Sequence, residues 1–276
     1  MSPTTILHVS DLHFGWPLRR GLPEQILREA HELAPDLVVV CGDLTQRAWP
    51  PQFRAARAWL EHLPQPLLVI PGNHDVPLFN VFERWRTPLR RYQHHISAAT
   101  DPVYQDDGLL AVGLSSARGA TIDGGWLLPA QVEQARAVIA GRGPHQAVVV
   151  AVHHHFVRVP GSRQKPIREA DELLATFDAW GVDLVLTGHS HWAYLHRTKG
   201  GLLLVQGGTT TSRRGKGQDR GRNNYHVITL NAHHIEVTRR QYDREGGEFV
   251  PVLTETYPRR TPAGREVSPP SPQRTT

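Results

Sequence analysis

Five short stretches of the sequence place metal-ligand side chains directly after apolar runs. They contain Asp11 and His13, Asp43, Asn73 with His74 and Asp75, the histidines at 153–155, and His189 with His191. Carboxylate, imidazole and amide donors without a thiolate suit borderline divalent ions such as Mn, Fe, Zn or Ni. Any one of these stretches alone is more often a polar turn. Because all five follow strand-like apolar runs, together they predict a metal site.

The number of donors points to two ions. Six or seven protein ligands exceed what one ion usually takes, whereas two ions that share a carboxylate use them naturally. Asp43 is a single carboxylate directly after Gly42, and we expect it to bridge the two ions. Asp11 and His13 are two residues apart in an extended segment, so their side chains point the same way and can reach one ion.

The apolar runs indicate the elements that position these stretches. Strand patterns cover 5–10, 36–41, 66–70, 109–114, 147–152 and 182–187, and helical spacing covers 23–34, 51–63, 129–140 and 168–180. Strand and helix therefore alternate, which predicts an α/β sheet covered by helices, with one site along the carboxyl ends of the strands.

The remaining segments carry three further expectations. We expect 78–96 to form one arginine-rich helix that borders the site. We expect 202–205, 225–230 and 235–242 to form an antiparallel meander, interrupted by a basic loop at 212–222. The Pro/Ser/Thr/Arg composition from residue 258 onward predicts a disordered tail. This gives a single domain over 1–257 and a tail over 258–276.

Composition and charge narrow the class of protein. The 276-residue chain has 31 Lys and Arg against 26 Asp and Glu, a net charge of +5, which suits anionic substrates. Lysine occurs only at 165, 199 and 216, and the one cysteine, Cys41, excludes an internal disulfide. No apolar run has membrane-spanning length and no signal pattern opens the chain, so we expect a cytoplasmic protein without a membrane partner. The antiparallel strands near the end could form the edge of a homodimer.

The polar stretches resemble the five motifs of the calcineurin-like metallophosphoesterase superfamily, in the family's order and over roughly residues 5–230. The matching motifs are Asp11-x-His13, Gly42-Asp43, Gly72-Asn73-His74-Asp75, His153 and Gly188-His189-x-His191. The resemblance extends to small bacterial phosphodiesterases similar to the class III cyclic-nucleotide enzymes. It implies a four-layer α/β-β/α sandwich of two mixed sheets, with a dinuclear metal centre at the strand ends.

The same resemblance implies a role for each residue. One metal would take Asp11, His13, Asp43 and His191, and the other Asp43, Asn73, His189 and one histidine of 153–155. Relatives often have a proline soon after this run, whereas this chain has Phe156, so the run alone leaves its register open. We favour His153, because it is the first residue after the strand, with His154 as the alternative. His74 would not bind metal. Oriented by Asp75, it would stabilise the phosphoryl oxygens or protonate the leaving group.

The implied function is metal-dependent hydrolysis of phosphate esters, by attack of a hydroxide that bridges the two metals. Small phosphodiesters such as cyclic nucleotides are the expected substrates. One alternative is a nuclease of the same superfamily, whose basic loop (Arg213, Arg214, Lys216, Arg220 and Arg222) would contact DNA phosphates. The chain lacks the coiled coil expected of such a DNA-repair enzyme. The other alternative is a non-catalytic scaffold on the same fold, against which the intact set of ligand residues argues.

Overall fold

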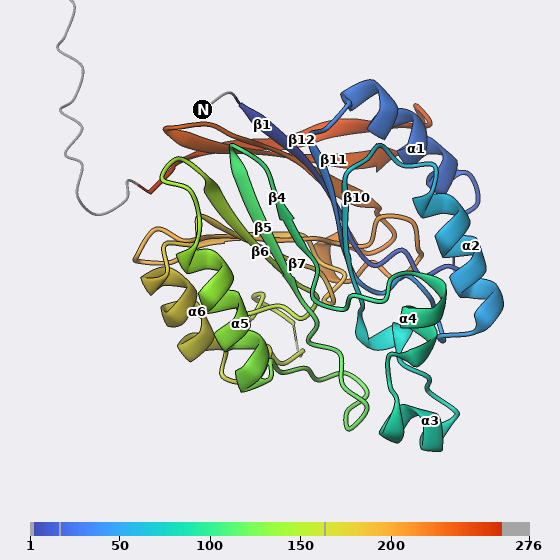
Figure 1. Cartoon of the computed structure of the whole chain (residues 1–276). Helices are drawn as coiled ribbons and strands as arrows, with labels where there is room; N and C mark the ends of the chain where they lie inside the picture. Colours follow the sequence, from blue (N-terminus) through green and yellow to red (C-terminus); the bar gives the residue numbers. More distant parts are fainter. Residues whose placement is uncertain (1–2, 17, 163, 261–276) are drawn as a thin grey trace, which may run out of the picture.

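Two six-stranded mixed sheets form the centre of the molecule (Figure 1). The computed structural model describes residues 3–16, 18–162 and 164–260. In spatial order, the first sheet contains β12 (Glu248–Pro258), β11 (His234–Asp243), β10 (Asn224–Leu230), β1 (Thr4–Val9), β2 (Leu37–Cys41) and β3 (Leu67–Ile70). The second contains β4 (Val103–Gln105), β5 (Leu109–Leu114), β6 (Ala147–Val152), β7 (Leu184–Thr187), β9 (Leu203–Gln206) and β8 (Tyr194–Arg197).

Helices cover the outer faces of both sheets (Figure 1). The first sheet packs against α1 (Leu22–Leu33), α2 (Pro50–Leu60) and α4 (Arg90–His95), and the second against α5 (Pro129–Ala140) and α6 (Ala170–Ala179). In β2, alternate residues face opposite layers: Val39 packs between the sheets, whereas Val38 and Val40 pack against the helices. The predicted four-layer α/β-β/α sandwich is therefore confirmed.

Parallel pairing brings the carboxyl ends of the central strands together. β1, β2 and β3 are mutually parallel in the first sheet, and β5, β6, β7 and β9 are parallel in the second. The predicted ligand stretches follow β1, β2, β3, β6 and β7. The fold thus collects these stretches at one edge of the sandwich.

The prediction for 202–205 is wrong. This segment forms β9, which pairs in parallel with β7 in the second sheet, and the antiparallel meander consists instead of β10, β11 and β12. The reason is burial on both faces. Leu203 and Val205 pack between the sheets, while Leu202 and Leu204 pack against α5 and α6, a pattern typical of an interior parallel strand.

The single helix expected at 78–96 is also wrong. Two short helices, α3 (Val81–Arg86) and α4, replace it, because Pro88 disfavours helical conformation at the residue before it and cannot donate a backbone hydrogen bond. The segment does border the site, since Leu78 and Arg84 line a pocket together with His74.

The predicted tail boundary at residue 258 is wrong as well. β12 extends to Pro258, and Arg259 forms an ion pair with Asp183 (Nε–Oδ1 3.0 Å). Its backbone N–H also donates to the carbonyl of His233 (2.7 Å). Nη1 of Arg260 donates to the carbonyl of Asp178 (3.1 Å), so the chain is held on the sandwich through Arg260. The rest of the predicted tail, 261–276, lies outside the described residues.

Two expectations about partners concern the surface. β12 lies at an edge of the first sheet, where a homodimer contact was expected, and that contact stays a prediction. Within the part of the chain that the structure describes, no helix is both long enough and apolar enough to cross a membrane.

Candidate metal centre

Three of the five polar stretches, those after β1, β2 and β7, share an unusual backbone conformation. Five of their residues are left-handed without being glycine: Asp11 (φ 56°), His13 (51°), Asp43 (53°), His189 (70°) and His191 (55°). Each such residue costs about 1–2 kcal/mol relative to the right-handed form. Conformations of this kind persist where surrounding contacts enforce them, and they gather at functional sites. All five belong to the predicted ligand set.

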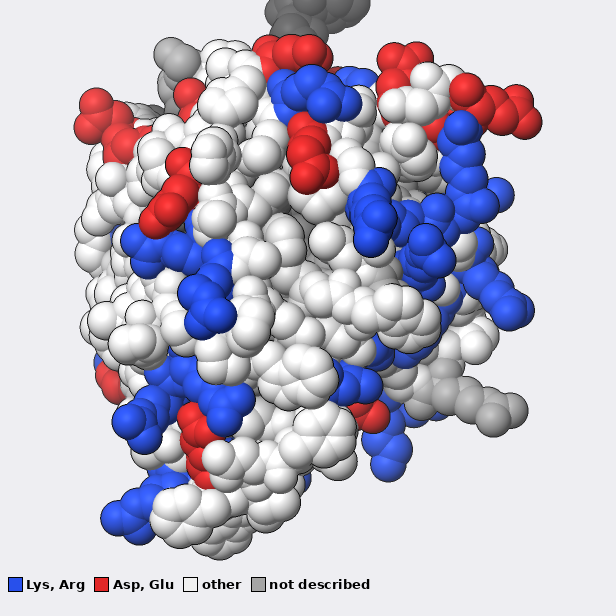
Figure 2. Space-filling view, turned by 90° about the vertical axis from the view of Figure 1, so that its right-hand side faces the viewer, with Lys and Arg blue, Asp and Glu red and all other residues white. Residues whose placement is uncertain are grey.

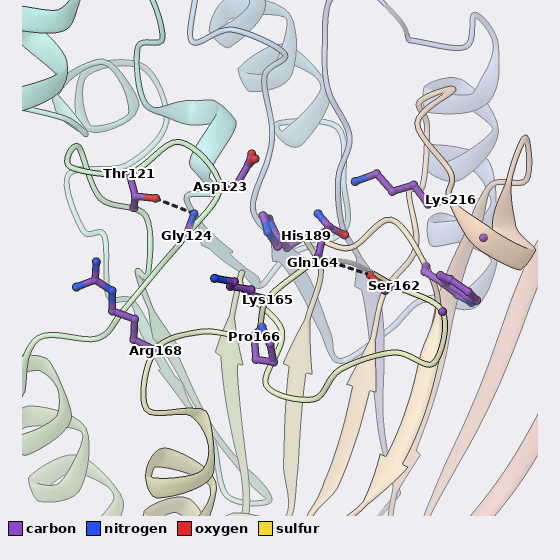
Figure 3. A pocket seen from close by; sticks show the side chains of 13 residues that line it. Thr121, Asp123, Gly124, Ser162, Gln164, Lys165, Pro166, Arg168, His189 and Lys216 are labelled. Atoms are coloured by element: carbon purple, nitrogen blue, oxygen red, sulfur yellow. Dashed lines mark hydrogen bonds between the residues drawn. The ribbon is translucent and has the colours of Figure 1, made fainter.

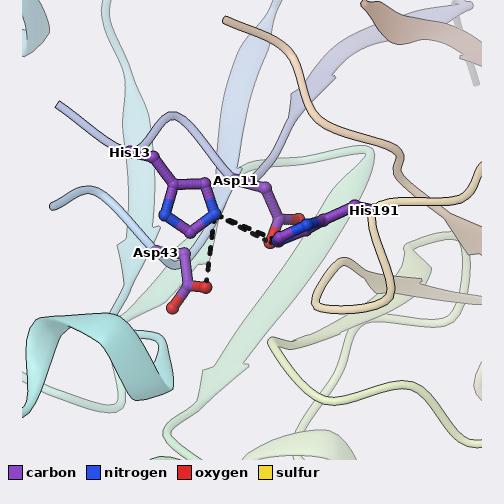
Figure 4. A group of neighbouring side chains, drawn as sticks. All are labelled: Asp11, His13, Asp43 and His191. Atoms are coloured by element: carbon purple, nitrogen blue, oxygen red, sulfur yellow. Dashed lines mark hydrogen bonds and ion pairs between the residues drawn. The ribbon is translucent and has the colours of Figure 1, made fainter. Parts of the chain in front are cut away.

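One group of four side chains is arranged around a common point (Figure 4). The nearest donor atoms of Asp11, His13, Asp43 and His191 all lie within 4.8 Å of one another, and all four residues are buried. Nε2 of His191 is 3.0 Å from both Nε2 of His13 and Oδ1 of Asp11. Nε2 of His13 is 3.6 Å from Oδ2 of Asp43. The sequence predicted these residues as one ligand set.

Two buried oxygens show that this group fits a cation. Oδ1 of Asp11 and Oδ2 of Asp43 have no hydrogen-bond partner among the described residues. A carboxylate oxygen left this way in the interior is costly unless a cation or donor occupies the space before it. Burial lowers the pKa of His13 well below its usual value, so its imidazole is in the neutral form that binds metals. The donor set suits a divalent ion.

Neighbouring groups aim the donors inward. The other oxygen of Asp11, Oδ2, accepts from Oγ of Ser10 (2.5 Å) and from the backbone N–H of His189 (3.0 Å). Nδ1 of His191 donates to the carbonyl of Arg214 (3.1 Å). These bonds leave Oδ1 of Asp11 and Nε2 of His191 free for an ion, an arrangement that supports metal ligands in proteins generally.

A second group gathers around Asn73. Its Oδ1 is 3.0 Å from both Nε2 of His153 and Nδ1 of His189. Its Nδ2 donates to the carbonyl of Ile122 (3.0 Å), which fixes the orientation of the amide. Nδ1 of His153 donates to the carbonyl of Cys41 (2.7 Å), so Nε2 is its free nitrogen. Burial lowers the pKa of His189, which keeps it neutral.

Asp43 lies between the two groups. Its Oδ2 faces His13 of the first group, and its Oδ1 is 3.3 Å from Nε2 of His153 in the second. Burial alone would lower the pKa of His153, but the carboxylate of Asp43, together with Asp11 and the carbonyl of Cys41, raises the pKa to about 9. A proton on His153 therefore compensates the charge of Asp43, as a bound cation also would.

The structure also distinguishes the three consecutive histidines. His153 directly follows β6 and reaches Asn73 and Asp43. Nδ1 of His154 instead lies 2.7 Å from Oγ of Ser116. The geometry therefore favours His153 over His154, as the sequence did, and the assignment of a ligand stays a prediction.

His74 lies beside the first group, and its orientation has an unexpected cause. Its ring is edge-on to that of His13, with centroids 4.8 Å apart. Its Nδ1 donates to the carbonyl of Gln46 (2.8 Å). The expectation that Asp75 orients His74 is wrong, because Asn73–Asp75 forms a single 3₁₀ turn, which directs successive side chains about 120° apart.

Asp75 instead joins two loops of the site. Its buried carboxylate accepts from the backbone N–H groups of Gly72 (2.9 Å), Leu44 (3.1 Å) and Thr45 (2.8 Å), and from Oγ1 of Thr45 (2.9 Å). Burial and the nearby carboxylate of Asp43 raise the pKa of Asp75 to about 7, against these donors. Asp75 is thus a positioning residue, holding the loop after β2 against the turn after β3.

We expect Asp75→Ala to destabilise the protein by about 3 kcal/mol, because several buried donors lose their acceptor. Asp75→Asn retains one acceptor oxygen and should cost less. Urea unfolding of metal-free protein measures both. An Asp75→Ala variant as stable as the parent would contradict the role of Asp75 in joining the loops.

Sequence reasoning did not place two arginines near His74: it did not single out Arg47, and it named Arg214 only as part of the basic loop. Arg47 and Arg214 line a pocket of about 190 Å³ together with His74 and Asn73. Nη1 of Arg47 lies 3.2 Å from Nδ1 of His74, and Nη1 of Arg214 lies 3.3 Å from Oε1 of Gln46. The sequence offered one signal for each residue that could have indicated a place near the site. Arg47 follows the Gly42-Asp43 motif by four residues, and Arg214 belongs to the basic loop.

The chain belongs to the calcineurin-like phosphoesterase family, whose profile matches residues 4–193. Membership supports metal-dependent hydrolysis of phosphate esters. A probable cyclic nucleotide phosphodiesterase from Synechococcus is 27% identical over 174 residues, 59% of this chain and 60% of that protein. A glycerophosphodiester phosphodiesterase from Enterobacter lignolyticus is 35% identical over 80 residues, 25% of this chain and 29% of that protein. The chain thus aligns with less than two thirds of the length of either relative.

Solved structures confirm the fold. A dimetal phosphatase from Danio rerio has a TM-score of 0.66 at 13% identity, covering 92% of this chain and 99% of its own. Purple acid phosphatase PPD1 from yellow lupin has a TM-score of 0.70 at 13% identity, covering 92% of this chain and 53% of its own. At such low identity the likeness concerns the fold alone.

Proposed function

We propose that this protein is a dinuclear phosphodiesterase that hydrolyses small phosphodiesters such as cyclic nucleotides. The observation that carries the proposal is the position of Asp43, whose two oxygens face two separate groups of metal-ligand side chains. That geometry suits a carboxylate shared by two ions. Both curated relatives are named as phosphodiesterases, which supports the diester as the substrate class.

The residues divide into those that hold the ions and those that hold the substrate. Asp11, His13, Asp43 and His191 would hold one ion, and Asp43, Asn73, His153 and His189 the other. When bound, the ions would neutralise the phosphate charge and activate water for attack. Arg47 and Arg214, in the pocket beside His74, would bind phosphate oxygens by charge-assisted hydrogen bonds.

His74 is placed to act on the ester itself. Because its Nδ1 is held by the carbonyl of Gln46, its Nε2 remains for a phosphoryl oxygen or a leaving-group oxygen. Burial lowers the pKa of His74, and an anionic substrate would oppose that shift by favouring the protonated ring. His74 would then donate a proton from Nε2 to the leaving group.

The anchoring of the basic loop disfavours the DNA nuclease. The backbone N–H of Lys216 donates to the carbonyl of His191 (3.0 Å), and Oδ2 of Asp219 accepts from the backbone N–H of Ala193 (2.6 Å). The loop therefore packs against the site rather than projecting from it. On the face shown in Figure 2, the basic side chains form separate groups with uncharged surface between them. A continuous basic stripe would suit a duplex better.

One surface supports the scaffold as a second candidate. Phe79, Phe82 and Trp85, in and just before α3, are 71%, 76% and 78% exposed. Apolar side chains gathered this way often mark a protein-binding surface. A scaffold that binds no metal would gain nothing from the buried oxygens of Asp11 and Asp43, which have no hydrogen-bond partner among the described residues. These oxygens therefore favour the enzyme.

A substrate panel separates the candidates. Manganese-loaded protein is incubated with bis-p-nitrophenyl phosphate, cyclic AMP and linear duplex DNA. The proposal expects hydrolysis of the small diesters and intact DNA. Rapid cleavage of DNA with poor turnover of small diesters would instead establish the nuclease. No hydrolysis by folded, metal-loaded protein would favour the scaffold.

A further inference from the structure

A second and larger pocket opens beside His189. It has a volume of about 800 Å³ and is lined by residues of 121–124, 161–162, 164–168 and 216–217, and by Trp192 (Figure 3). This volume falls within the range of about 300–1,000 Å³ that is typical of small-molecule sites. His189 also contacts Asn73 in the candidate metal centre, and Asp123 lines both this pocket and the pocket beside His74, so this pocket adjoins the centre.

The charge of the pocket is its distinguishing feature. Two of the three lysines in the chain, Lys165 and Lys216, line it together with Arg168, against a single carboxylate, Asp123. Among the described residues, none of these three cations has an ion-pair partner. An anion bound in the pocket would supply the charged partner that these cations lack.

The walls of the pocket are held in place. The ring of Trp192 lies against Gly161, where an added Cβ would touch it at 3.5 Å, and against Gly217, where an added Cβ would overlap it. Gly217 also has a φ of +54°, which disfavours other residues. The guanidinium of Arg168 stands 4.4 Å from the ring centroid of Trp126, a cation–π contact that orders it.

From the pocket's charge and position we infer a subsite for a second anionic group. We propose that Lys165, which lies between Arg168 on one side of the pocket and Lys216 on the other (Figure 3), binds a phosphate carried by one ester arm of the substrate with the help of these neighbouring cations, while the scissile phosphate lies at the metal centre. The substrate class is then phosphodiesters with a phosphorylated arm. This inference rests on the proposed phosphodiesterase function. Compact ammonium groups suit phosphate as point charges, and such bonds are stronger than neutral ones.

Binding can be tested without turnover. Calorimetric titration of full-length, metal-free protein compares thymidine 3′,5′-bisphosphate with thymidine 5′-monophosphate. The bisphosphate should bind at least about 10-fold more tightly, the effect of one charged hydrogen bond. Lys165→Gln/Lys216→Gln should abolish this preference, whereas Lys199→Gln, at the exposed third lysine, should retain it. Circular dichroism checks that each variant is folded.

Kinetics then separates this inference from the function on which it rests. The manganese-loaded enzyme is assayed on the p-nitrophenyl ester of thymidine 5′-phosphate, with and without a 3′-phosphate. A kcat/KM ratio of about 10 or more in favour of the phosphorylated ester is expected, falling toward 1 in the double lysine variant. Equal affinities and equal rates in the parent, or a preference that survives in the double variant, would overturn the subsite. Failure to hydrolyse any diester would overturn the phosphodiesterase instead, and the binding preference would still be read from calorimetry.

Discussion

Asp43→Asn is expected to reduce hydrolysis of bis-p-nitrophenyl phosphate by about 1,000-fold, a loss of about 4 kcal/mol of transition-state stabilisation. Asparagine tolerates the left-handed backbone that Asp43 adopts (φ 53°), so the loop should keep its shape. The substitution removes the negative charge and replaces one oxygen by an amide N–H₂ group. Neither group of ligands then has its shared carboxylate.

Metal content measured by mass spectrometry should fall together with activity, from two ions per chain to fewer than one. Asp107→Asn is the matched control, because Asp107 is exposed and lies between β4 and β5, at the amino end of β5 and so away from the carboxyl strand ends that carry the site. It should behave as the parent does. Near-normal turnover in Asp43→Asn would refute the bridging role. Lost activity with two ions still bound would show that Asp43 acts on the substrate instead.

His74→Ala should lower kcat by about 100-fold or more, the usual contribution of a general acid, while leaving the metal content unchanged. The reason is geometric. The side chain of His74 is held by the carbonyl of Gln46 and belongs to neither ligand group. The backbone N–H of His74, which donates to Oδ1 of Asp43 (2.8 Å), is retained in the variant.

If His74 donates a proton to the leaving group, the effect of the variant should depend on that leaving group. The His74→Ala variant should lose more activity toward an ester with a poor alkoxide leaving group than toward the p-nitrophenyl ester. The reason is that p-nitrophenolate needs little protonation to leave. His145→Ala, at an exposed histidine, serves as the control. Loss of metal from His74→Ala would make His74 a ligand or a support for one. Equal losses on both esters would assign it to binding of phosphoryl oxygens.

Much of the site could be predicted because each motif directly follows a strand. Continuous apolar runs, such as that at 37–41, marked the strands, and parallel strands bring their carboxyl ends together. His153 could be favoured for the same reason, since it is the first residue after β6. These inferences needed only local patterns and one general rule of α/β folds.

Other features depend on contacts between distant residues. Two partners of Asp75, Leu44 and Thr45, lie about thirty residues away in the loop after β2, and no local pattern indicates them. Arg214 reaches the pocket of His74 because its loop is pinned to His191. The sheet to which 202–205 belongs was predicted wrongly, because a short apolar run has the same sequence pattern in either sheet. Only the burial of both of its faces assigns it to the second.

The most direct test of the central claim is metal-dependent hydrolysis by the intact chain. Protein stripped with a chelator is assayed on bis-p-nitrophenyl phosphate before and after addition of Mn²⁺, with Asn73→Ala alongside. A dinuclear phosphodiesterase should be inactive when stripped and recover with Mn²⁺. Asn73→Ala should recover little, because it loses the amide oxygen that lies 3.0 Å from both His153 and His189. Folded protein that stays inactive with Mn²⁺, or full activity in Asn73→Ala, would contradict the account.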